Sequence, residues 1–73
     1  MIKRSFQIAF ADMKGNPDSR WQRLGSSYIY RFKPGTNLTG LEYKRCVKCP
    51  WEMSLLTDLE LSEYEWAKME NES

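Results

Sequence analysis

Two cysteines three positions apart are the residues of this chain with the clearest chemical potential. They lie in the segment Cys46-Val47-Lys48-Cys49-Pro50, and two thiolates at this spacing can share one tetrahedral zinc ion. A closed zinc site needs four ligands, and the chain has no His and no further Cys, so carboxylates or a second chain would have to complete it. A thioredoxin-like role would need a preceding Trp and a strand-to-helix context. We therefore expect two reduced thiols and no metal or cofactor, with zinc bound through a dimer as the alternative.

Aromatic and basic residues are interleaved in three other segments. Rings that stack on bases, beside cations that follow phosphates, bind single-stranded nucleic acid. Protein interfaces are also rich in Trp, Tyr and Arg. The three segments are Arg20-Trp21-Gln22-Arg23, Tyr28-Ile29-Tyr30-Arg31-Phe32-Lys33 and Tyr43-Lys44-Arg45.

The rings of these segments have different simplest explanations. Tyr28, Tyr30 and Phe32 alternate along one strand and are best explained as its core face. Trp21 lies between two Arg in a loop-like segment and is harder to explain as core. We expect an exposed Trp21 to anchor a partner. The predicted partner-binding residues are Arg20, Trp21, Arg23, Arg31, Lys33 and Lys44.

Charge is sorted along the chain. Residues 1–49 hold ten of the eleven Lys and Arg but three of the ten Asp and Glu, whereas residues 50–73 hold seven acidic residues and one Lys. The net charge of +1 therefore conceals a basic front part of +7 and an acidic end of −6. Like charges gathered on one surface attract an oppositely charged partner from a distance. Either the basic part stays available to a partner, or the acidic end folds over it and the two cancel.

The acidic end has two interpretations of its own. Residues 58–72 could imitate the charge of a nucleic-acid backbone and occupy a basic channel of a partner. The commoner arrangement is the solvated side of a helix, where acidic residues in the first turn also complement the helix dipole. The sequence leaves both open.

The composition argues against catalysis, secretion and membrane insertion. With no His, the chain lacks the commonest general acid and base and any Ser-His or Cys-His nucleophile pair. No apolar run approaches the ~20 residues that cross a bilayer, and residues 1–15 lack the apolar stretch of a secretory signal. We expect a cytoplasmic, non-enzymatic monomer whose chain begins at its own Met1. Its 73 residues, 14% of them aromatic, allow one small core built mainly from rings.

Apolar alternation and turn residues predict the elements that must position these side chains. Residues Ile2–Ala11 alternate as a strand, and Gly15 and Pro17 place a loop over Asp12–Ser19. The short stretch Arg20–Gly25 fits either a helical turn or an extended lead-in. A second strand is predicted over Ser26–Lys33 and a third from Leu41 to Pro50.

A C-terminal helix completes the expected architecture. Ser62 and Glu65 match a capping box, which predicts a helix over Ser62–Met69 with Trp66 as its anchor on the sheet. Leu55 and Leu59 also fall near helical spacing, so the helix could start as early as Leu55, or a short strand could precede it. We therefore expect an α+β fold, in which a small three-stranded antiparallel sheet is covered by a C-terminal helix. Residues 1–69 would form a single small domain and residues 70–73 a frayed tail. The uncovered sheet face would carry a set drawn from Lys3, Arg31, Lys33, Lys44 and Lys48.

Taken together, the basic aromatic front part, the Cys46-Val47-Lys48-Cys49-Pro50 segment and the acidic end resemble small phage-encoded regulators of host bacterial RNA polymerase, of the kind found in a lytic Xanthomonas phage. The resemblance spans the whole chain and rests on length and general character rather than on a diagnostic motif. It implies a protein that binds the β and β′ subunits near the RNA exit channel, close to nascent RNA. Such a regulator displaces the σ factor at initiation and promotes antitermination. A small single-stranded nucleic-acid-binding module with a basic aromatic sheet face is the alternative.

Overall fold

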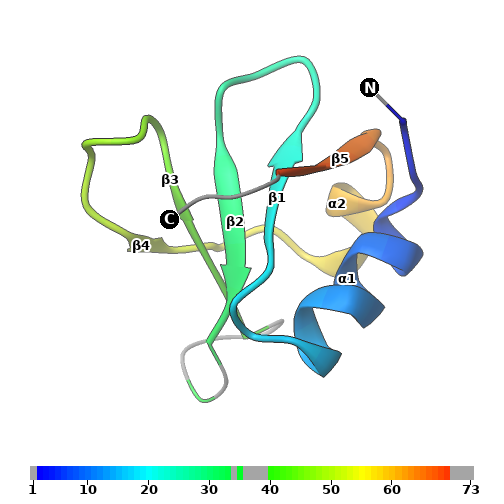
Figure 1. Ribbon diagram of the computed structural model, residues 1–73, viewed down its shortest axis with the longest axis horizontal. Helices are drawn as coiled ribbons and strands as arrows, with labels where there is room; N and C mark the ends of the chain where they lie inside the picture. The colour runs from blue at the N-terminus through cyan, green and yellow to red at the C-terminus, as the bar shows by residue number, and fades with distance from the viewer. Residues whose placement is uncertain (1, 34, 36–39, 70–73) are drawn as a thin grey trace.

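Five short strands form one antiparallel sheet beside two helices. The computed structural model describes residues 2–33, 35 and 40–69. The strands are β1 (Arg20–Arg23), β2 (Ile29–Phe32), β3 (Leu41–Lys44), β4 (Glu52–Met53) and β5 (Trp66–Met69), and the helices are α1 (Phe6–Gly15) and α2 (Asp58–Leu61). The sheet order is β4-β3-β2-β1-β5, and every neighbouring pair is antiparallel. Figure 1 shows β4 and β5 at opposite edges, with both helices near the β5 edge.

The predicted α+β class with an antiparallel sheet is confirmed, but two of its details are wrong. The sheet has five strands instead of three. The first predicted strand is absent because its segment forms α1, while the short stretch left open after Ser19 becomes β1 and the chain adds β4 and β5. The helix that packs on the sheet is the N-terminal α1, which contacts β1, β2 and β5. No helix of the described residues is long and apolar enough to span a membrane.

Helix α1 occupies the segment for which the apolar pattern predicted a strand. Its buried residues are Phe6, Ala9 and Met13, which follow the three-to-four-residue spacing of one helix face. Ile8, which the strand prediction placed on the same face as Phe6, is half exposed. The hydroxyl of Ser5 caps the helix by accepting a hydrogen bond from the Ile8 N–H at 3.5 Å. The strand prediction over Ile2–Ala11 is wrong because these few apolar residues satisfy both periods, and the helix delays the expected loop until after Gly15.

Strand register sorts the interleaved residues of β1, β2 and β3 onto opposite faces. Trp21 pairs with Tyr30, which pairs with Tyr43, and directly paired residues point to the same side of a sheet. This side, the covered face, packs on α1 through Phe10 against Phe32 and Phe6 against Trp66. The alternate residues form the opposite side, here named the open face. Its members on these three strands are Arg20, Gln22, Ile29, Arg31, Glu42 and Lys44.

The C-terminal part forms a single helical turn followed by an edge strand. Thr57 caps α2: its hydroxyl accepts from the Glu60 N–H at 3.2 Å, and the Glu60 carboxylate accepts from the Thr57 N–H at 2.9 Å. The predicted helix over Ser62–Met69 is therefore wrong, because this earlier capping box starts the helix and the chain turns after Ser62. Trp66 does anchor on the sheet, but as a fully buried residue of β5. The tail expected at 70–73 lies outside the described residues.

A disulfide-closed turn replaces the second half of the predicted third strand. Strand β3 ends at Lys44, and Cys46 and Cys49 form a disulfide across a turn in which the Cys49 N–H donates to the Cys46 carbonyl at 3.1 Å. The expectation of two reduced thiols is wrong, because this tight turn brings the two Cα atoms to 5.1 Å, within the range that a disulfide spans. The turn leads the chain back to β4, and Trp51 lies between the turn and this strand.

Candidate functional site

Trp51 lies next to three cations of the open face. The distance from the centre of its ring is 4.2 Å to the Arg31 guanidinium carbon, 4.8 Å to the Lys44 Nζ and 5.4 Å to the Arg20 guanidinium carbon. All three distances allow cation–π attraction to the indole face. The ring is half-buried, so part of it contacts solvent. This group, the Trp51 cluster, is the one place in the described chain where a single ring meets three cations.

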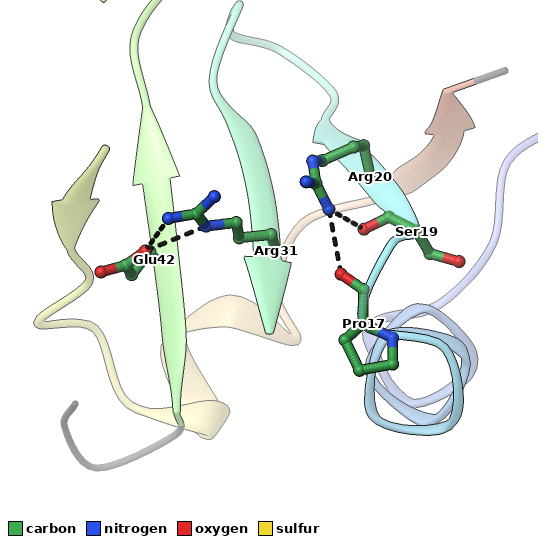
Figure 2. A network of polar contacts seen from close by, with 5 residues as sticks. All are labelled: Pro17, Ser19, Arg20, Arg31 and Glu42. Carbon is green, nitrogen blue, oxygen red and sulfur yellow. Dashed lines mark hydrogen bonds and ion pairs between the residues drawn. The ribbon is translucent and has the colours of Figure 1, made fainter. Parts of the chain in front are cut away.

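The two arginines of the Trp51 cluster are oriented by different acceptors. The Arg31 Nε and Nη2 both donate to one Glu42 oxygen, at 2.9 and 2.6 Å. Arg20 donates through a single nitrogen, Nη1, to the carbonyls of Pro17 at 3.0 Å and Ser19 at 3.1 Å. Figure 2 shows both arrangements, with Arg31 reaching across to β3 and Arg20 turned back toward the end of α1. Arg31 is thus neutralised by a carboxylate, whereas Arg20 is fixed in place and keeps its charge.

The disulfide-closed turn orients the third cation. The Lys44 Nζ donates to the Val47 carbonyl at 3.1 Å, and Val47 lies between the two bonded cysteines. Ser27 fixes the other side of the turn by donating its hydroxyl to the Arg45 carbonyl at 2.8 Å. Lys44 forms no ion pair in the part of the chain that the structure describes, so its charge also remains available.

A recess of about 660 Å³ opens beside the Trp51 ring. Apolar side chains from β2, β5 and the disulfide-closed turn line it together with the indole, and two of the cations border it. Asp18 is the one acidic residue among its lining. Ile29 is buried beneath it, whereas Val47 is 72% exposed. The residues used in the argument below are Arg20, Ile29, Lys44, Val47, Trp51 and Met69.

Trp21, the predicted anchor, is buried in the core. It is 3% exposed, and its indole N–H donates to the Asp12 carboxylate at 2.9 Å. This hydrogen bond, with smaller contributions from Ser19 and Lys68, lowers the pKa of Asp12 against the opposing effect of burial. The prediction of an exposed Trp21 is wrong because the segment between the two Arg is the strand β1, whose alternation turns the ring toward α1 while Arg20 faces the other way.

Arg23 also belongs to the covered face and does not join the Trp51 cluster. Its guanidinium carbon lies 4.8 Å from the ring centre of Tyr28 and 4.3 Å from that of Tyr64. Its Nη1 donates to the Tyr30 hydroxyl at 3.3 Å, and burial raises the pKa of Tyr30. These contacts hold Arg23 against the rings of the covered face. Lys33 is exposed immediately after β2 and is not among the residues that line the recess.

The acidic residues of the C-terminal part leave the Trp51 cluster uncovered. Among the described residues 58–65, Glu65 forms an ion pair: its Oε1 lies 3.4 Å from the Lys3 Nζ, and both side chains are largely exposed. Arg20, Arg31 and Lys44 form no ion pair with this segment. Of the two arrangements left open by the charge distribution, the described part of the chain therefore keeps the basic face accessible.

Sequence reasoning missed Trp51 and the recess. Of the six predicted binding residues, Arg20, Arg31 and Lys44 come together on the open face, while Trp21 and Arg23 lie on the other side. Trp51 has no cation next to it in the sequence. Its three cations come from β1, β2 and β3 and meet the ring only in the folded chain. The sequence offered one weak signal for Trp51: it is an aromatic residue directly after the turn-forming Cys49-Pro50.

Metal ligands and similar proteins give no further indication of what this site does. The described residues contain no group of three or more Cys, Asp or Glu arranged to hold a metal ion. Comparison with protein-family models, with curated proteins and with solved structures gave no match. The site therefore has to be interpreted from its own geometry.

Proposed function

We propose that this chain is a non-enzymatic regulator that docks on host bacterial RNA polymerase through its open face. The observation that carries the proposal is the Trp51 cluster, in which a partly accessible ring lies beside Arg20 and Lys44, two cations without a carboxylate partner in the described residues. Trp and Arg are the residues that most often dominate the energy of protein interfaces. A cation-bearing face also accelerates encounter with an acidic protein surface.

The distribution of rings favours a protein partner over single-stranded nucleic acid. A nucleic-acid platform stacks successive bases on successive rings. Here Tyr30 and Trp66 are buried on the covered face, and Tyr28 and Tyr43 stack on one another at 5.3 Å on that same side. Among the described residues, the open face presents one ring, that of Trp51, with cations beside it. A single ring suits one anchored contact better than a run of stacked bases.

The identity of the partner and the regulatory effect come from the resemblance noted for the sequence. Polymerase regulators of that kind bind the β and β′ subunits near the RNA exit channel, displace the σ factor and promote antitermination. We propose the same activities for this chain, acting in the host cytoplasm as a monomer without a cofactor. Its compact dimensions of 30 × 27 × 23 Å suit a module that adds to the surface of a larger enzyme.

Purified core RNA polymerase from Xanthomonas tests the proposal. The wild-type chain, immobilised at one end, should bind core polymerase with an affinity that falls as salt rises, because surface cations are screened. In transcription reactions it should reduce initiation at a σ-dependent promoter and increase the fraction of transcripts that pass an intrinsic terminator.

The variant Trp51→Ala provides the internal control for the site. Loss of a central Trp anchor typically costs about 2 kcal/mol or more of binding energy, so both effects should weaken together. No binding of core polymerase by a folded wild-type chain would reject the polymerase as partner. Binding that Trp51→Ala leaves unchanged would reject the open face as the docking surface.

A further inference from the structure

The recess beside Trp51 combines apolar walls with cations. Its volume is about 660 Å³, within the range of ligand-binding clefts. Ile29, Val47 and Met69 line it together with the indole ring. An acidic surface held only by cations would leave the exposed Val47 and the solvent-facing part of the indole in contact with water. The partner of this site therefore needs an apolar group as well as negative charge.

The cations set where the negative charge of the partner must lie. Arg20 uses only its Nη1 for internal hydrogen bonds, so the remaining guanidinium N–H groups face no acceptor in the described chain. The Lys44 Nζ donates one N–H to the Val47 carbonyl. An ammonium group has three such donors, so two remain for a partner. Both residues border the recess. Carboxylates on either side of an inserted apolar group would meet these donors.

We infer that the recess takes a bulky apolar side chain from an acidic peptide segment of the partner, with Trp51 as the wall it packs against. This inference rests on the proposed function and names the kind of polymerase segment that the open face would recognise: an extended or helical stretch with carboxylates flanking one large aliphatic or aromatic residue. Val47 and Met69 form the apolar border, and Arg20 and Lys44 pair with the flanking carboxylates.

Short synthetic peptides test this without the polymerase. The first peptide alternates Glu and Ser around one central Phe, the second replaces that Phe by Ala, and the third probe is oligo(dT) of matched charge. Trp21 and Trp66 are buried at 3% and 0% exposure, so a change of tryptophan emission on titration reports mainly on Trp51. The Phe peptide should bind about tenfold or more tightly than the Ala peptide, because a buried Phe side chain contributes that much in transfer free energy.

Two variants of the full chain identify the recess as the binding place. Val47→Ser removes an apolar wall group that is 72% exposed, so the fold should survive, and it should reduce the preference for Phe over Ala several-fold. Ile8→Ser is the matched control, since Ile8 is an exposed apolar residue on α1, and it should change nothing.

The remaining outcomes overturn the inference. Equal binding of the Phe and Ala peptides would show that charge alone attracts the partner, and tighter binding of oligo(dT) would identify a nucleic-acid site. Self-association of the chain at the same concentrations, seen by sedimentation and abolished by Val47→Ser, would mean that a second copy of the chain fills the recess instead of an acidic peptide. No binding of any probe also rejects the inference. Failure here with intact polymerase binding leaves the proposed function standing, whereas peptide binding without polymerase binding rejects only the polymerase as partner.

Discussion

The two faces of the sheet divide between them the aromatic and basic residues that alternate in the sequence. The covered face receives the rings, and Tyr30, Trp21 and Trp66 pack there against α1 with almost no exposure. The open face receives Arg20, Arg31 and Lys44 and gains a single ring from the loop before β4. Two residues adjacent in sequence, such as Arg20 and Trp21, thus serve different purposes. Strand alternation converts an interleaved pattern into a core and a charged surface.

The largest difference between the faces should appear in folding stability. Trp66→Ala removes a fully buried ring that contacts Phe6 and Tyr30, and such truncations cost about 3–5 kcal/mol. Trp51→Ala should cost less than about 1 kcal/mol, since it loses surface cation–π contacts. Urea denaturation followed by circular dichroism measures both. Similar losses for the two variants would mean that Trp51 is part of the core.

Charge removal should act on binding at the open face and leave folding intact. Lys44→Gln removes a cation of the Trp51 cluster, and Lys14→Gln is the matched control because Lys14 lies in α1 against Phe10. We expect Lys44→Gln to slow association with core polymerase several-fold and to flatten its salt dependence. Lys14→Gln should bind as the wild type does. Equal effects would indicate long-range attraction by net charge without a defined site.

The covered face should give the protein an acid-sensitive contact. The Trp21 N–H holds the pKa of Asp12 below its ordinary value of 3.8, so the ionised carboxylate stabilises the folded state. This contribution is present above about pH 4 and is lost as the pH falls through the lowered pKa of the folded state. Thermal unfolding between pH 6 and pH 2 should show a steeper loss for the wild type than for Asp12→Asn. Parallel curves would contradict the role of this contact.

The smallest expected effect concerns the disulfide-closed turn. Cys46→Ser with Cys49→Ser removes the covalent link while the hydrogen bond from Lys44 to the Val47 carbonyl remains available. A bond that closes so short a loop restricts the unfolded chain little, so we expect a modest loss of stability. Binding to core polymerase should weaken no more than about twofold. A loss comparable to that of Trp51→Ala would mean that the covalent link itself holds Val47 and Lys44 in their binding positions.

The fold was predictable where one periodicity dominated. Residues Tyr28–Lys33 alternate clearly, and β2 lies within them. The N-terminal segment failed because Phe6, Ala9, Phe10 and Met13 satisfy the helix period while Phe6, Ile8 and Phe10 satisfy the strand period, and only packing on the sheet decides between them. The C-terminal prediction failed because two capping-box patterns follow one another there, Thr57 with Glu60 and Ser62 with Glu65, and the sequence alone does not rank them.

The site was only half predictable, because it is assembled from distant segments. The strand alternation of Arg31 and Lys44 indicated two of its cations, and both lie on the open face. The anchor was assigned to Trp21 because its neighbours are basic, whereas Trp51 acquires its cations by tertiary contact with β1, β2 and β3. Side-chain direction within a short strand depends on register, which the sequence did not determine.

Photo-crosslinking from both sides of the molecule tests the central claim most directly. A benzoylphenylalanine at Val47 probes the recess, and the same residue at Ile8 probes the outer side of α1; both positions are exposed, at 72% and 51%. With purified core polymerase, we expect a crosslink to a polymerase subunit from position 47 and none from position 8. A crosslink from position 8 alone, or equal crosslinking from both, would contradict docking through the open face.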